Sequence, residues 1–295
     1  METTQASFPS GFLTGAITAI GVKMAIYPNE RVKLLYVLSH LKESMYGGKA
    51  FKGRMDCLTQ TVKFKGLFGL WQESANIVLL YSAHHAFNFG FKEQFGKWFS
   101  NRDSSSMMKL LTVNMISGSM AGLATLCIEH PVMLARLAHS RQFGVRKPIQ
   151  LRNLKNYIIQ RFIDKRPLKL YKGIWTYVPH IFVYRGAYFG LYDAGFAYFY
   201  GSQKNTNFIK LWLLALLTTS IATLISHPLA SVRSLLLMEL KYPDKKYKGT
   251  IDCIINLFKK GHQRALIIGW QPALFSCTSS ALLLACYSKL PLLTP

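Results

Sequence analysis

The chain has 295 residues, half of them hydrophobic, and its 36 Lys and Arg against 13 Asp and Glu give a formal net charge of +23. A balance this basic indicates an anionic partner, either nucleic acid or a membrane surface. The basic residues lie between long apolar segments, and zinc-finger spacing, RNA-binding aromatic motifs and a basic zipper are absent from the sequence. We therefore expect anionic membrane lipid as the partner and no nucleic acid.

Long apolar segments and short amphipathic segments alternate along the chain. The N-terminal residues lack the basic start of a cleavable signal peptide, which predicts internal targeting. About 20 residues span a bilayer as a helix, so each long segment is expected to cross it. The expected long helices are 9–40, 74–99, 108–142, 175–200, 207–240 and 268–290, and the expected short helices are 54–65, 150–164 and 250–262.

Three related motifs recur at nearly constant spacing. They read YPNERVK, HPVMLAR and HPLASVR, and their prolines, Pro28, Pro131 and Pro228, lie 103 and 97 residues apart. A second echo, FKGRMDC and YKGTIDC, falls two periods apart. Self-similarity at one period is typical of a repeat architecture. The sequence predicts three repeats within one structural domain, at 1–103, 104–203 and 204–295.

Enzymatic and metal chemistry find no support in the sequence. The five cysteines form no C-x-x-C pair and no zinc-type cluster, so buried thiols are expected. His84 and His85 are adjacent and face different directions on a helix, which argues against a metal site. No nucleophile–base constellation, paired acids or phosphate-binding loop is present. We expect neither an enzyme nor a bound cofactor, apart from cardiolipin or another anionic lipid.

Several segments together resemble the mitochondrial carrier family, and within it the ADP/ATP carriers. They are FLTGAITAIGVKMAIYPNERVKLL, SGSMAGLATLCIEHPVMLAR, VYRGAYFGLYD and the two short loop motifs given above. The resemblance implies an all-α membrane protein of the mitochondrial inner membrane. Its fold would be a three-repeat, six-transmembrane-helix barrel with short matrix helices around a water-filled cavity. Carriers of this kind alternate access between two gates.

The resemblance implies a matrix-side gate built from Pro-x-acid-x-x-base motifs. Met133 and Ala230 stand where the second and third acids belong, so one acid and three bases remain and at most one pair can form. An unpaired charge at membrane depth is costly. The remnants of this gate are Pro28, Glu30, Lys33, Pro131, Arg136, Pro228 and Arg233.

The gate on the opposite, intermembrane side would use aromatic–acid–x–x–base motifs on the other three helices. Its basic positions hold Gly96, Phe196 and Pro291, and Ser288 replaces the third acid. This leaves two acids and no base in register. The remnants of this gate are Glu93, Tyr192, Asp193 and Tyr287.

The resemblance also implies cavity and lipid-contact residues. The cavity candidates are Lys23, Arg136, Tyr184, Arg185 and Arg233, and other nucleotide-binding positions of the ADP/ATP carriers are lost. Four positive charges could hold a smaller anion, or they could be relics. The lipid-contact candidates are Gly53, Tyr171, Lys172, Gly173 and Gly249.

Degenerate gates beside intact packing residues favour one function over its alternatives. The leading hypothesis is a transport-incompetent accessory or scaffolding subunit, packed against other protein subunits of an inner-membrane respiratory-chain assembly. The alternative is a divergent transporter that exchanges a nucleotide or a smaller anion. An ADP/ATP carrier with compensating changes elsewhere, and a uniport with a single gate, also remain open.

Overall fold

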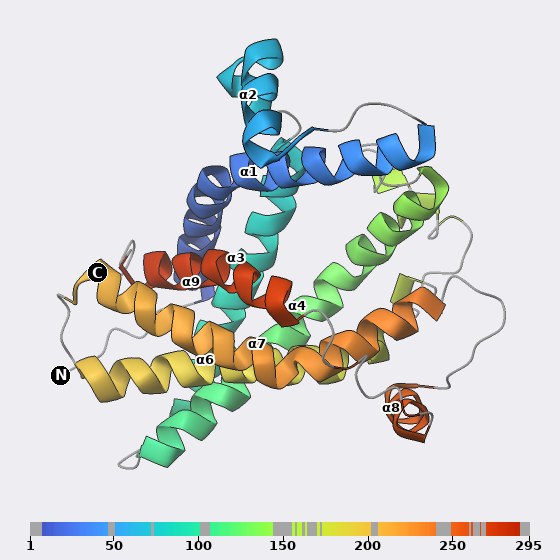
Figure 1. Cartoon of the computed structure of the whole chain (residues 1–295). Helices are drawn as coiled ribbons and strands as arrows, with labels where there is room; N and C mark the ends of the chain where they lie inside the picture. The colour runs from blue at the N-terminus through green and yellow to red at the C-terminus, as the bar shows by residue number, and fades with distance from the viewer. Residues whose placement is uncertain are drawn as a thin grey trace.

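The protein is entirely helical in the residues that the computed structural model describes (Figure 1). These residues are 8–46, 51–71, 74–100, 107–143, 155–156, 158–160, 163, 170–171, 173–201, 206–239, 249–259, 261, 266 and 270–289.

Six long helices within this part of the chain carry the fold. They are α1 (Phe8–Tyr46), α3 (Ser74–Ser100), α4 (Met107–Phe143), α6 (Val178–Tyr200), α7 (Phe208–Glu239) and α9 (Trp270–Lys289). The shorter elements are α2 (Arg54–Lys65), η1 (Leu67–Trp71), η3 (Ile174–Thr176) and α8 (Thr250–Lys259). These bounds confirm the predicted long helices and two predicted short ones, whereas the third, 150–164, lies mostly outside the described residues.

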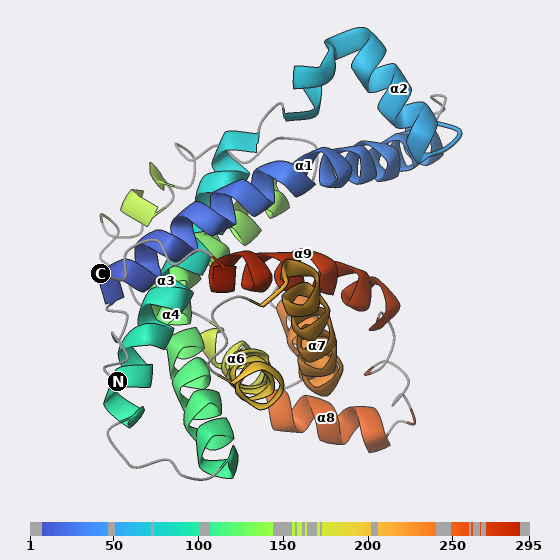
Figure 2. The same cartoon turned by 90° about the vertical axis from the view of Figure 1, so that its left-hand side faces the viewer.

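The long helices form a closed ring. Each packs against the next long helix along the chain, and α9 returns to pack against α1. Figures 1 and 2 show α2 and α8 lying outside this ring. The predicted six-helix barrel is therefore confirmed.

The first and second helices of each pair differ in polarity. Among the described residues, three segments are long and apolar enough to cross a membrane by composition alone: Phe8–Val32, Met108–Ala135 and Phe208–Leu236. These segments lie in α1, α4 and α7, respectively. Their partners α3 and α6 carry charged groups such as Lys92 and Arg185, whose side chains face the inside of the ring. A charged group is tolerated at membrane depth when it faces the bundle interior. Composition alone therefore underestimates the ability of α3 and α6 to cross the membrane.

Each first helix contains its repeat's proline. Pro28, Pro131 and Pro228 lie inside α1, α4 and α7, where proline removes one backbone donor and favours a kink. Figure 1 shows α1 changing direction along its length.

Two histidines that precede these prolines tie the first helices to their partners. Nδ1 of His130 lies 3.0 Å from the carbonyl oxygen of Leu170, and Nδ1 of His227 lies 3.2 Å from that of Leu266. Trp71 plays the corresponding part in the first pair by donating from its indole nitrogen to a carbonyl of α1. The segment before each second helix is thus fixed to the first helix.

The short helices α2 and α8 dock through equivalent cysteines. Cys57 is buried against Val32, and Cys253 is buried against Val232. Burial raises the pKa of the Cys57 thiol. The expectation of buried thiols is wrong for Cys127, which is exposed and does not line the cavity described below.

Close approach of α4 and α6 depends on small residues. A Cβ atom added at Gly122 would lie 2.6 Å from Cγ of Arg185. We therefore expect Gly122→Ala to destabilise the purified protein by about 1–3 kcal/mol, because overpacking forces neighbouring atoms to shift. The measurement is the thermal unfolding midpoint in mild detergent. Gly21→Ala is the matched control, since no atom lies within 4 Å of its added Cβ, and equal midpoints for the two variants would contradict the packing argument.

Candidate functional site

A cavity of about 510 Å³ lies inside the ring, with walls from α1, α3, α4, α6 and α7. This volume is in the range of small-molecule sites. Most of the wall is apolar, so a few polar groups decide what can bind. They are Lys23, Tyr81, His84, Asn88, Glu129, His180, Tyr184, Arg185 and Arg233.

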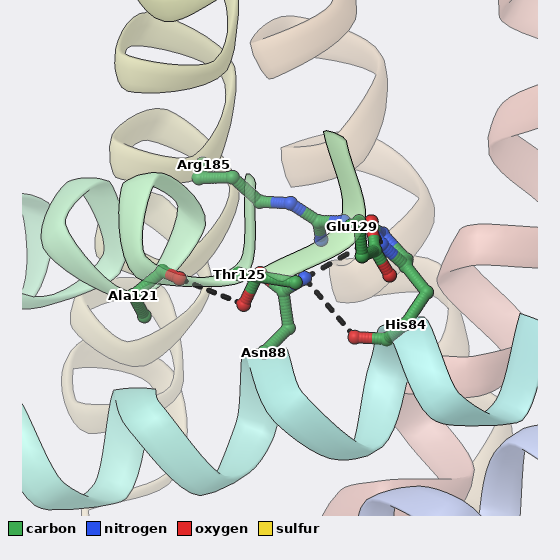
Figure 3. Close-up of polar contacts among 6 residues, drawn as sticks. All are labelled: His84, Asn88, Ala121, Thr125, Glu129 and Arg185. Carbon is green, nitrogen blue, oxygen red and sulfur yellow. Dashed lines mark hydrogen bonds and ion pairs between the residues drawn. The ribbon is translucent and has the colours of Figure 1, made fainter. Parts of the chain in front are cut away.

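Three of these side chains form a charged network between α3, α4 and α6. Nδ1 of His84 lies 2.5 Å from Oε2 of Glu129, and Nε2 of His84 lies 2.5 Å from Nη2 of Arg185. Figure 3 shows the Arg185 side chain reaching toward His84 and Glu129. Asn88, one turn along α3, donates to the carbonyl oxygen of His84. The predicted cavity base Arg185 is therefore held by an imidazole and, through it, by a carboxylate.

The partners of His84 define its protonation. A guanidinium group can only donate hydrogen bonds, so Nε2 of His84 must accept from Arg185. The ring proton of a neutral imidazole then sits on Nδ1, where it is donated to the Glu129 carboxylate. The network holds one positive and one negative charge with a neutral imidazole between them.

The second predicted base, Lys23, is paired within its own helix. Its Nζ lies 2.6 and 2.8 Å from the two carboxylate oxygens of Glu30, seven residues further along α1, and 4.7 Å from the centroid of the Tyr81 ring. The surviving acid of the matrix-side motif therefore satisfies a cavity lysine of its own helix. The side chains of Lys33 and Arg136 lie outside the described residues.

Arg233 differs from the other two cations. Its guanidinium lies 5.2 Å from the centroid of the Tyr177 ring. Its buried Nε has no hydrogen-bond partner, and none of the carboxylates that the structure describes pairs with it. Arg233 is thus a cation that lines the cavity and is available to a bound anion. Tyr184 lies nearby on the wall, with its ring stacked on that of His180.

At the end away from the prolines, α3, α6 and α9 are joined by a ring of polar contacts. Nζ of Lys92 lies 2.8 Å from Oδ2 of Asp193. The hydroxyl of Tyr192 lies 2.7 Å from Oγ of Ser288, and the hydroxyl of Tyr287 donates to Oε1 of Glu93 at 3.1 Å. We call Lys92, Glu93, Tyr192, Asp193, Tyr287 and Ser288 the polar ring.

The same kind of contact occurs three times in the polar ring, once between each pair of the helices α3, α6 and α9. In each contact, the first residue of one helix's motif reaches the second residue of the motif on another helix: Lys92 reaches Asp193, Tyr192 reaches Ser288, and Tyr287 reaches Glu93. Lys92 occupies the aromatic position of its motif. No base stands in the register of the motif, as predicted, but Lys92 supplies one from the position one residue before the acid of α3.

Comparison with known proteins identifies the family. The mitochondrial carrier protein family matches residues 4–103 and 204–293. This chain belongs to the mitochondrial carrier family. It is 30% identical to ADP/ATP translocase 3 of Bos taurus over 289 residues, which cover 96% of this chain and 97% of the relative. It is 31% identical to ADP/ATP translocase 2 of Bos taurus over 258 residues, 86% of each chain, and 29% identical to ADP/ATP translocase 4 of Mus musculus over 287 residues, 96% and 89% of the two chains.

The carrier is accordingly a protein of the mitochondrial inner membrane, and the predicted resemblance to ADP/ATP carriers is confirmed. The relatives named here are translocases, that is, transport proteins. The polar ring contains the residues predicted for the intermembrane-side gate, and its orientation in the membrane stays a prediction.

Three of the lipid-contact candidates are glycines that directly precede a helix. Gly53 and Gly249 directly precede α2 and α8. Gly173 has a φ of 83° before η3, a conformation that favours glycine. Tyr171 is stacked on His130, and Lys172 lies outside the described residues. Lipid binding by this set stays a prediction.

Sequence reasoning missed His84, Glu129, Lys92 and Ser288 as members of the site. A signal for three of them was available, because an ionisable residue inside a membrane helix is by default a candidate functional residue. The prediction that His84 and His85 do not form a metal site stays untested, although in the described part of the chain no three His, Cys, Asp or Glu side chains gather as a metal site would require.

Proposed function

We propose that this carrier moves an anion, either a nucleotide or a smaller oxyanion, across the inner membrane by alternating access. One observation carries the proposal: a cavity lined by Lys23, Arg185 and Arg233 lies beside a polar ring made of separable contacts. One ion pair and two hydrogen bonds can form and break within a cycle. A cavity cation that pairs with none of the described carboxylates can bind an anion.

The case for a transport-incompetent accessory subunit loses part of its basis. It rested on two gates without usable pairs, and Lys92 supplies the missing base of one of them. Contacts to other inner-membrane subunits remain a proposal, and no surface feature in the described part of the carrier argues for them. The transporter alternative is therefore the better supported function.

Uptake into liposomes tests the proposal. Purified carrier in cardiolipin-containing vesicles is given labelled ADP, succinate or sulfate outside and the same unlabelled anion inside. We expect saturable uptake of at least one of these anions. Arg233→Met should reduce that uptake roughly tenfold or more, because a hydrogen bond to a charged group contributes roughly 1.5–3 kcal/mol.

The control is Lys97→Met, which removes a cation of α3 that does not line the cavity; it should transport at the wild-type rate. Uptake no higher than in protein-free vesicles, from a preparation that unfolds cooperatively on heating, would overturn the transport proposal and return the accessory role to first place.

A further inference from the structure

The partner of Arg185 is a His84–Glu129 pair, although a carboxylate alone would be enough to compensate its charge. The His84 imidazole stands between the guanidinium and the carboxylate and contacts both. An imidazole is the side chain whose charge changes most readily near neutral pH. The pair therefore holds a site where one proton can be gained or lost inside the cavity.

Anion binding changes the charge balance of this network. With Arg185, neutral His84 and ionised Glu129, the network has no net charge. An oxyanion that takes the hydrogen bonds of Arg185 leaves the Glu129 carboxylate uncompensated, which is costly away from water. The same event removes the Arg185 donor from Nε2 of His84, where Nδ2 of Asn88 lies 3.5 Å away, and removes the adjacent cation that opposes a second ring proton. Uptake of one proton by the His84–Glu129 pair then restores neutrality.

Other charged groups around His84 are already engaged or are cationic. Helix α1 offers Lys23, which is bound to Glu30. Helix α4 offers Glu129, α6 offers Arg185 with Tyr184 and His180, and α7 offers Arg233. On α3 itself, Tyr81 and His85 are in ring contact with one another, and His85 is also in ring contact with His84. Among these residues, Glu129 is the carboxylate that lies in contact with His84, so it is the group that a new proton would neutralise.

We propose that an oxyanion bound at Arg185 is accompanied by one proton held on the His84–Glu129 pair, so that anion movement by this carrier is proton-coupled. The inference rests on the proposed transport function and adds a co-transported ion to it. The proton enters from the side from which the anion binds, and it leaves when Arg185 returns to His84 after the anion departs.

Proton uptake on binding can be measured without transport. ADP, succinate or sulfate is titrated calorimetrically into detergent-purified carrier at mildly alkaline pH, where these probes are almost fully ionised. Repeating the titration in buffers of different ionisation enthalpy gives the number of protons taken up. We expect about one proton per anion, and an affinity that weakens up to about tenfold per pH unit as pH rises.

Matched variants locate the proton. His84→Gln keeps a side chain that can donate and accept hydrogen bonds but cannot gain a proton, and Glu129→Gln keeps an acceptor for Nδ1 of His84. Both should bring the proton number close to zero. His85→Gln replaces the neighbouring histidine, which does not line the cavity, and should keep the wild-type number. A near-zero value in the wild type, or an unchanged value in both His84→Gln and Glu129→Gln, would overturn the inference.

Flux in vesicles with a trapped pH dye separates this inference from the transport proposal. The vesicles for this assay contain none of the transported anion, because exchange of one anion for another would return one proton for each proton that enters. Net anion uptake without acidification of the lumen then refutes proton coupling and leaves transport standing. Proton-linked binding without any uptake refutes transport and retains the protonation of the pair. Failure of all three probes to bind overturns both.

Discussion

Replacing Lys92 with methionine is expected to destabilise the carrier by roughly 3–5 kcal/mol, because Asp193 is left as an uncompensated charge inside the helix ring. The two side chains are 17% and 24% exposed and their charged atoms lie 2.8 Å apart, so solvent offers little replacement. Lys92 also lies 3.8 Å from Glu93, and its loss affects both acids of the polar ring. The measurement is the thermal unfolding midpoint in mild detergent, combined with uptake in vesicles, which should fall in parallel.

Two further variants distinguish pairing from a general effect of losing a lysine. Lys97→Met removes a cation from the same helix, and no ion pair of Lys97 is found among the residues that the structure describes; its unfolding midpoint should stay near that of the wild type. Combining Lys92→Met with Asp193→Asn removes both charges and should recover most of the lost stability. If Lys92→Met were as stable as Lys97→Met, the polar ring would not be a closed gate.

The fold could be predicted from the sequence because the information is local and repeated. Pro28, Pro131 and Pro228 mark the same place in three long apolar segments, and the cysteines of FKGRMDC and YKGTIDC are buried at the same docking position of α2 and α8. Helix length follows from the apolar run, and the closed ring follows from three similar helix pairs.

The gate could be predicted only in part, because motif register is a poor guide to partners on other helices. The predicted remnants Glu93, Tyr192, Asp193 and Tyr287 all take part in the polar ring. The search for bases, however, considered positions after each acid and none before it. Lys92 precedes Glu93, and a long lysine side chain reaches Asp193 across to α6 from there.

In the predicted matrix-side gate, the prediction differs from the structure in another way. The acid Glu30 was expected to pair with a base on another helix, and it pairs with Lys23 of its own helix. Lys23 and Glu30 are seven residues apart, about two turns of helix, so they share one face of α1. Counting gate acids against gate bases ignored this pair. It also ignored Glu129, which stands beside the HPVMLAR motif and compensates Arg185 through His84.

Arg185→Met is expected to lower both stability and uptake, by a mechanism that a second substitution can separate. Arg185 is 7% exposed, and its removal leaves Glu129 with only the imidazole of His84 among its described partners, so the carboxylate is uncompensated at a pH where the His84–Glu129 pair takes up no proton. An uncompensated buried charge costs roughly 3–5 kcal/mol. Uptake of the transported anion should fall tenfold or more, since a charged hydrogen-bond donor is lost from the cavity wall. Unfolding midpoints and initial uptake rates measure the two effects.

The double variant Arg185→Met/Glu129→Gln removes both charges of the network. We expect it to regain most of the stability that Arg185→Met loses, because no carboxylate remains uncompensated, while uptake stays low because the cation that faces the anion is still missing. Lys210→Met, which removes an exposed cation of α7, is the control for both readouts. A double variant that stays as unstable as the single one would show that Arg185 is not the compensating charge of Glu129. One that transports at the wild-type rate would place the anion elsewhere, and Arg185 would then serve only to neutralise a carboxylate within the membrane.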